Sequence, residues 1–172
     1  MKRNRLQLLT LTALIAALTA ALTSLQIIPA PNGGYAHVGD SIVFLAGCLL
    51  PAPYSLLAAA IGGGLADLLR GAPNWLPATV ILKACMALCF GAKSKKLLSG
   101  RNIAALAAAT IINMAGYYFY EWLFLGKRMA QVAFFTGGGL IQSGGSIVLF
   151  VGLAIALDAI RIKDRMQLKR YH

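Results

Sequence analysis

The sequence predicts an all-α membrane protein, a bundle of six transmembrane helices with both ends in the cytoplasm. Of its 172 residues, 59% are hydrophobic and 12% are charged, whereas soluble domains carry about half and about a quarter. Several apolar stretches approach the roughly 20 residues that cross a bilayer as a helix. The basic residues form short runs between these stretches, which is typical of topology-setting charges and argues against a nucleic-acid-binding face.

We expect the first helix at about residues 6–28, as a retained span, because it is longer than the apolar core of a signal peptide. A turn-rich loop from Pro29 to Asp40 follows. The apolar run at about 40–51 is too short to cross a membrane alone. It is either a half-span shielded by its neighbours or part of a tilted span. The remaining spans, all within one domain covering 1–172, are expected at about 54–70, 76–92, 102–125 and 136–160.

The distribution of basic residues predicts the orientation. Six crossings place both ends on one side of the membrane. If that side is the cytoplasm, most Lys and Arg residues lie there, in segments 2–5, 93–101 and 161–170. Only three loop cations lie on the other side: Arg70, Lys127 and Arg128. Because cytoplasmic loops are enriched in Lys and Arg, the termini are predicted to be cytoplasmic.

Ionisable residues within membrane spans are costly in lipid and usually face the bundle interior. Lys83 is the most informative of them in this sequence. Steps of four place Trp75 and Thr79 on the same helical face as Lys83. One interpretation is an internal ion pair between Lys83 and Asp67 of the preceding helix. The other is a contact between Lys83 and an acceptor on a bound ligand, and the two are compatible.

A polar stripe is predicted on the fifth helix. Asn113, Tyr117 and Glu121 recur every four residues and therefore share one face. Neighbouring aromatic residues fit an interfacial belt, but this belt explains neither Asn113 nor Glu121. Gln142 on the sixth helix adds an amide at a comparable depth.

The loop before the second helix contains residues that are suited to contact a ligand. Gly34 permits close approach of the backbone, and Tyr35 and His37 supply an aromatic ring and a hydrogen-bonding imidazole. Asp40 could contact a ligand, but its position favours a cap on the following helix. His37 has no second His and no cysteine pair nearby, so no metal site is expected.

These residues predict a binding site for a small organic molecule rather than a catalytic centre. They would form a mostly apolar pocket with a few polar groups on the outer side of the membrane. No catalytic motif, metal motif or phosphate-binding loop is present, so the protein is predicted not to be an enzyme and any ATP must be used by a partner.

The first helix carries a row of small residues at spacings of four, Ala13, Ala17 and Ala21, beside Ala16 and Ala20. Such rows allow helices to approach closely. Composition alone favours packing within the bundle over contact with another protein.

In combination and order, these residues resemble the S components, the substrate-binding membrane subunits, of energy-coupling factor (ECF) transporters. The resemblance spans nearly the whole chain and is closest to the branch of riboflavin, hydroxymethylpyrimidine and pyridoxine carriers. It lies in five segments: Gly33-Gly-Tyr-Ala-His-Val-Gly-Asp40, Ala66-Asp-Leu-Leu69, Pro77-Ala-Thr-Val-Ile-Leu-Lys83, Gly116-Tyr-Tyr-Phe-Tyr-Glu121 and Leu140-Ile-Gln142. The chain departs from many relatives at Thr136-Gly-Gly-Gly139, where they carry Pro-Gly-Asn.

The resemblance implies a multi-pass protein of a bacterial plasma membrane that captures a vitamin or vitamin precursor outside the cell. The ligand would be similar to pyridoxine or hydroxymethylpyrimidine, with riboflavin as a further candidate. It also implies docking through Ala13, Ala17 and Ala21 onto a transmembrane coupling subunit, with two ATPase subunits that use ATP. The alternatives are a solitary carrier or channel for a small organic molecule and a membrane-embedded enzyme, which would need an acid cluster or metal motif that the sequence lacks.

Overall fold

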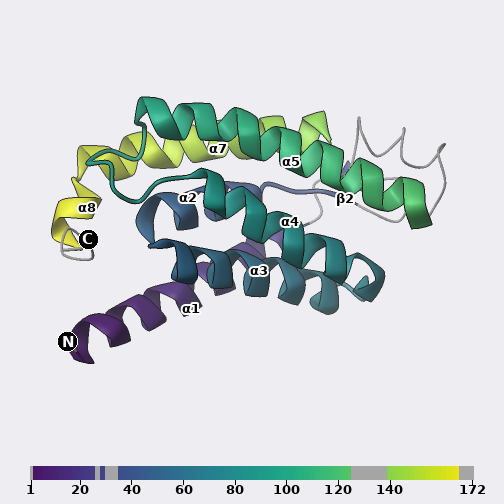
Figure 1. The fold of residues 1–172 in the computed structure, drawn as a ribbon, viewed down its shortest axis with the longest axis horizontal. Coiled ribbons are helices and arrows are strands. Elements are labelled where there is room, and N and C mark those ends of the chain that lie inside the picture. Colours follow the sequence, from purple (N-terminus) through teal and green to yellow (C-terminus); the bar gives the residue numbers. More distant parts are fainter. Residues whose placement is uncertain (1, 26–27, 30–34, 125–138, 167–172) are drawn as a thin grey trace.

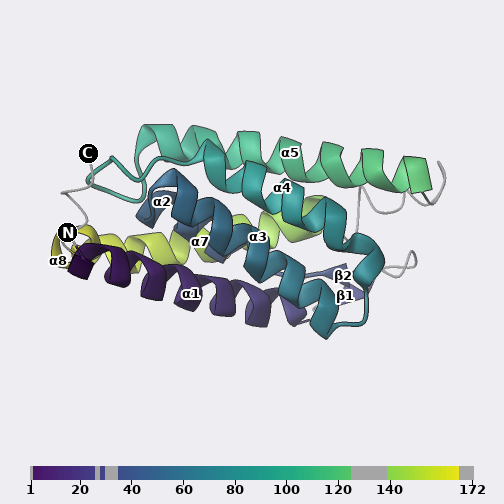
Figure 2. The ribbon, with the colours of Figure 1, turned by 60° about the horizontal axis from the view of Figure 1, so that its bottom comes forward.

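The computed structural model describes residues 2–25, 28–29, 35–124 and 139–166. Its helices lie side by side in one elongated bundle (Figures 1 and 2). The start of α1 (Lys2–Ser24) and the short α8 (Ile162–Arg165) lie at the same end of this bundle. A two-stranded antiparallel hairpin, β1 (Ile28–Pro29) with β2 (Tyr35–Ala36), lies at the opposite end.

The helical fold class is confirmed, and each of the six predicted ranges contains a helix. Besides α1, these helices are α2 (Asp40–Leu49), α3 (Ala52–Leu69), α4 (Leu76–Cys89), α5 (Gly100–Phe124) and α7 (Leu140–Ala159). The predicted end of the first helix at 28 is wrong: α1 ends at Ser24, and Ile28 belongs to β1. The predicted start of the last helix at 136 lies outside the described residues. The hairpin, α8 and a 3-10 turn before α4, η1 (Pro73–Trp75), were not predicted.

Four of these helices are long and apolar enough to cross a membrane: α1 from Arg5 onward, α3, α5 and α7. The other two are shorter, with 10 residues in α2 and 14 in α4. Six crossings and cytoplasmic termini therefore stay predictions. α2 is buried along its whole length and packs against α1, α3, α4 and α7. This agrees with the shielded half-span that the sequence offered as one alternative.

Glycines of α3 bring three helices unusually close together. A Cβ atom added at Gly62 would lie 2.7 Å from the carbonyl oxygen of Ala16 in α1. One added at Gly63 would lie 2.9 Å from Cγ2 of Thr79 and 3.0 Å from Cγ of Lys83, both in α4. Because real Cβ contacts are longer than this, only glycine allows α3 to pack so tightly against α1 and α4.

This packing predicts that Gly62→Ala will destabilise the protein. The added methyl group would overlap the Ala16 carbonyl and push α1 away from α3, and overpacking typically costs about 1–3 kcal/mol. We expect a lower midpoint of thermal unfolding in detergent. The matched control is Gly152→Ala in α7, where a new Cβ meets no atom within 4 Å. Equal midpoints for the two variants would contradict the close α1–α3 contact.

Three phenylalanine side chains, one of them from α2, pack together in the core of the bundle. Phe44, Phe90 and Phe150 are 1%, 5% and 0% exposed. The centroid of the Phe44 ring lies 5.1 Å from that of Phe90 and 5.7 Å from that of Phe150. Phe44 lies about one helical turn after Asp40. An apolar layer therefore separates the start of α2 from the end of the bundle that carries α8.

Candidate functional site

The centre of the site is a buried ion pair. Nζ of Lys83 in α4 lies 2.5 Å from Oδ1 of Asp40, the first residue of α2. Their side chains are 0% and 1% exposed. A buried charge is costly unless it is paired and hydrogen-bonded, so each of these residues depends on the other.

Two neutral side chains form hydrogen bonds with this pair, and a third side chain contacts one of them. The Lys83 ammonium donates to Oδ1 of Asn113 at 3.3 Å, and Nε2 of Gln142 donates to Oδ2 of Asp40 at 2.9 Å. Nδ2 of Asn113 lies 3.5 Å from Oγ of Ser143. We call these five residues the polar cluster. They come from α2, α4, α5 and α7, so the cluster ties four helices together.

A second set of polar and aromatic groups adjoins the polar cluster. The hydroxyl oxygens of Thr79 and Tyr117 lie 2.9 Å apart, and the carboxyl group of Asp67 lies beside Thr79. The Lys83 Nζ lies 5.4 Å from the centroid of the Tyr117 ring, and the Trp75 ring lies 6.1 Å from it.

The segment before α2 is attached to the bundle through His37, which is 6% exposed. Its Nδ1 accepts a hydrogen bond from the Gly39 amide at 3.1 Å, so Nδ1 carries no proton. Its carbonyl oxygen accepts from Oγ of Ser146 in α7 at 3.4 Å. Gly34 lies outside the described residues, as does the side chain of Tyr35, so their predicted contacts are untested.

The predicted cap at Asp40 is wrong, and the partner of Lys83 is not Asp67. Asp40 does not cap α2: the N-cap residue is Gly39, and no side chain caps this helix end. Asp40 is already inside the first turn, and its carboxylate points to Lys83 instead. The internal ion pair that was one interpretation of Lys83 forms with Asp40 and not with Asp67, whose carboxyl group lies beside Thr79.

The predicted stripe on α5 is buried as a unit, which places its residues on the inner face. Asn113, Tyr117 and Glu121 are 0%, 9% and 2% exposed, whereas Tyr118 and Trp122 are 37% and 41% exposed. Asn113 and Tyr117 join the site described above, and Glu121 lies one turn further along the same face. Thr79, Lys83 and Gln142 are also buried, and Trp75 is half-buried beside Tyr117.

Three residues of this region were not among the predicted site residues: Asp67, Ser143 and Ser146. Asp67 was considered only as a partner for Lys83. The two serines lie three residues apart in an otherwise apolar helix, next to Gln142. That polar spacing on one helical face is the signal that could have identified them.

The alanines of α1 divide into two faces. Ala16 and Ala20 are each 5% exposed and pack within the bundle. Ala13, Ala17 and Ala21 are exposed on the outer surface of the helix. Packing within the bundle therefore accounts for Ala16 and Ala20, and it leaves the other three alanines available to lipid or to another protein.

Comparison with known families identifies the chain. The model of the family described as "ECF-type riboflavin transporter, S component" matches residues 3–159. The chain belongs to this family. An S component is the substrate-binding membrane subunit of a transporter and not an enzyme. Among the described residues, no group of three or more His, Cys, Asp or Glu side chains could hold a metal ion.

A curated relative is also similar to this S component over most of its length. It is an "Uncharacterized protein in gap 3'region" from Pyrococcus woesei, 27% identical over 137 residues. The match covers 78% of this chain and 90% of the relative.

Proposed function

We propose that this S component captures a vitamin or vitamin precursor at the outer face of a bacterial plasma membrane, for ATP-driven uptake by partner subunits. One observation carries the proposal: four helices place charged and amide side chains in the interior of the bundle, where apolar side chains would be enough to pack the helices together. Buried ionisable residues in membrane helices usually mark a substrate site. In a family of substrate-binding subunits, the polar cluster is the natural position for the ligand.

The chemistry of the site supports a neutral heteroaromatic ligand, similar to pyridoxine or hydroxymethylpyrimidine, with riboflavin as a further candidate. The amides of Asn113 and Gln142 can both donate and accept hydrogen bonds, which suits ring nitrogens and hydroxyl groups. Tyr117 and Trp75 offer aromatic faces for stacking. The ammonium of Lys83 is already neutralised by Asp40, so the ligand need not supply a negative charge.

The distribution of charge supports the orientation. The start of α1, the loop between α4 and α5, and α8 lie at one end of the bundle (Figure 2). Among the described residues, these segments and the residues next to them carry many cations: Arg5, Lys93, Lys95, Lys96, Arg101, Arg161, Lys163 and Arg165. The positive-inside rule makes this end cytoplasmic. The hairpin end then faces outward.

The partners are a transmembrane coupling subunit and two ATPase subunits that consume ATP. Support comes from family membership and from the exposed alanine row on α1, where a partner helix can approach closely. The second candidate is a solitary carrier or channel that moves the ligand without an ATPase.

A ligand screen tests the proposed function. The purified protein in detergent is heated with B vitamins and their precursors, one at a time. Because a bound ligand stabilises the native state by mass action, a ligand present at about 100 times its Kd adds about 2.7 kcal/mol. We expect one heteroaromatic compound to raise the unfolding midpoint clearly. No response to any vitamin or precursor would contradict the proposal.

Reconstitution into liposomes separates the two candidate functions. Liposomes that contain this chain alone should bind the ligand but accumulate none of it. Flux of the ligand without ATPase subunits would favour the solitary carrier.

A further inference from the structure

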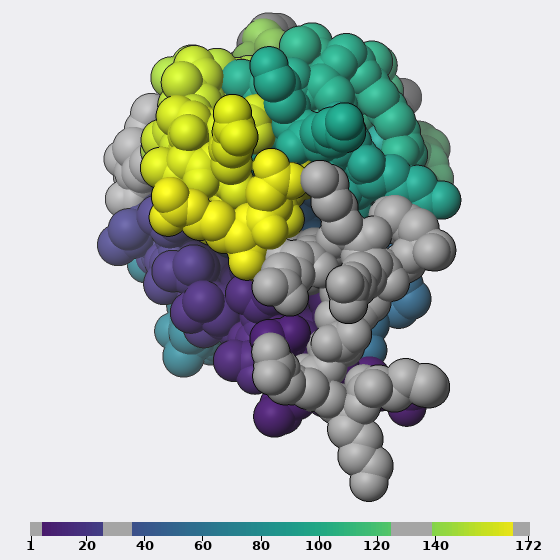
Figure 3. Space-filling model, turned by 90° about the vertical axis from the view of Figure 1, so that its left-hand side faces the viewer, coloured from purple at the N-terminus to yellow at the C-terminus, as the bar shows by residue number. Residues whose placement is uncertain are grey.

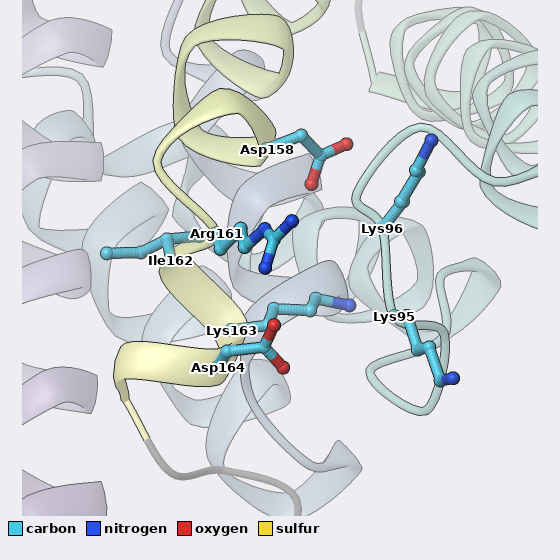
Figure 4. Close-up of a pocket in the computed structure, with 7 residues that line it drawn as sticks. All are labelled: Lys95, Lys96, Asp158, Arg161, Ile162, Lys163 and Asp164. Carbon is cyan, nitrogen blue, oxygen red and sulfur yellow. The ribbon is translucent and has the colours of Figure 1, made fainter.

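A basic pocket lies at the end of the bundle that holds α8, away from the polar cluster. It has a volume of about 160 Å³ and is lined by Lys95, Lys96, Asp158, Arg161, Ile162, Lys163 and Asp164. Figure 4 shows the side chains of Arg161 and Lys163 extending from the α7–α8 turn toward the loop that carries Lys95 and Lys96. Figure 3 shows this end of the molecule, where α8 in yellow lies beside the teal surface of the middle of the chain.

Both walls of the pocket are fixed by hydrogen bonds. The two carboxylate oxygens of Asp158 accept from the backbone amides of Leu97 and Leu98, at 2.8 and 3.2 Å. Nζ of Lys163 donates to the carbonyl oxygens of Ser94 and Ala92, at 2.8 and 3.3 Å. The loop of residues 92–98 is therefore attached to the α7–α8 turn from both directions, and the pocket is formed before any ligand arrives.

The backbone at Arg161 adds a second sign of a built site. Its φ is +51°, in the left-handed region, and it is the one non-glycine residue with positive φ among those the structure describes. This conformation is uncommon for a residue with a Cβ and is often found at ligand clamps. Here it ends α7, begins α8 and directs the guanidinium toward the facing loop (Figure 4).

The pocket has an excess of positive charge. Four cations line it against two carboxylates. The oxygens of one carboxylate, Asp158, are already engaged by amide groups. Burial also lowers the pKa of the Lys163 ammonium, so a bound anion would offset the cost of keeping it charged.

We propose that this pocket binds the phosphate group of an anionic phospholipid. Guanidinium and ammonium donors are the groups that recognise phosphate, and basic pockets at the ends of membrane helices hold anionic headgroups. A free phosphate ion would satisfy the same donors. The lipid is favoured because Ile155 and Ile160 of α7, next to the pocket in sequence, are 58% and 45% exposed and offer an apolar surface for acyl chains.

The test compares lipids of different charge on the full-length protein. Unfolding midpoints are measured in neutral detergent with phosphatidylglycerol, with phosphatidylcholine, or with inorganic phosphate. We expect phosphatidylglycerol alone to raise the midpoint. Two variants remove cations from the pocket: Arg161→Asn and Lys95→Gln/Lys96→Gln. Asparagine is chosen at position 161 because it tolerates a left-handed backbone. Each variant should bind phosphatidylglycerol about fivefold more weakly per cation removed. Arg5→Gln, at the same end but outside the pocket, should respond like the wild type.

Several outcomes would overturn the proposal. An equal response to phosphatidylcholine would show that charge is not recognised. An equal response to inorganic phosphate would assign the pocket to a soluble anion instead of a lipid. A Lys95→Gln/Lys96→Gln variant that keeps the wild-type response would also refute it, even if Arg161→Asn fails to fold. None of these results depends on vitamin binding.

Discussion

Replacing Lys83 by alanine is expected to abolish ligand binding and to destabilise the protein more than any other single change proposed. The substitution removes the ammonium that contacts Asp40 and Asn113, and it leaves a carboxylate unpaired in the bundle interior. Removing one partner of a buried ion pair typically costs about 3–5 kcal/mol. Thermal unfolding in detergent measures the stability, and binding of the vitamin identified by the screen measures the function.

A double variant separates these two effects. Lys83→Met with Asp40→Asn removes both charges and keeps similar side-chain volumes, and replacement of a buried pair by neutral groups is often tolerated. We expect this protein to recover much of the lost stability but not the binding. Lys93→Ala, at an exposed lysine in the loop that follows α4, is the control for loss of a positive charge. Wild-type stability in Lys83→Ala would contradict the buried pair.

The second large effect is expected from Ala17→Trp. Ala17 lies in the middle of the exposed alanine row of α1. An indole there would hold a partner helix away, since close approach requires small side chains. We expect the variant to bind vitamin normally but to lose co-purification with the coupling subunit and ATP-driven uptake.

The control for Ala17→Trp is Ile111→Trp on α5, at a position that is 66% exposed. It adds a similar bulky ring to the outer surface of a different helix. This variant should retain both complex formation and uptake. Uptake at the wild-type rate by Ala17→Trp, in a protein that still binds vitamin, would show that this face of α1 is not the docking surface.

The helices could be predicted from sequence because hydrophobic length and flanking charges act locally. The ion-pair partner of Lys83 could not be predicted from the sequence. Both Asp40 and Asp67 lie in the same half of the bundle, so depth along the helices does not distinguish them. The choice depends on how α2 and α3 are rotated and placed, and that depends on tertiary packing. At α3, the glycine face approaches Lys83, while Asp67 reaches Thr79.

The same limit applies to the first helix. The sequence shows two adjacent alanine rows, and both are small enough for close packing. Composition favoured the bundle for Ala13, Ala17 and Ala21, whereas the family resemblance favoured a partner. In the structure the bundle uses Ala16 and Ala20 instead. α8 escaped prediction because four residues carry too little periodicity, and its start depends on the unusual backbone of Arg161.

The glycines of α3 have a mechanical consequence. Gly62 packs against the Ala16 carbonyl and the Thr19 side chain of α1, and the next residue, Gly63, packs against the side chains of Thr79 and Lys83 in α4. Because close-packed interiors transmit strain, a displacement of α1 is expected to reach Lys83 in α4 through α3.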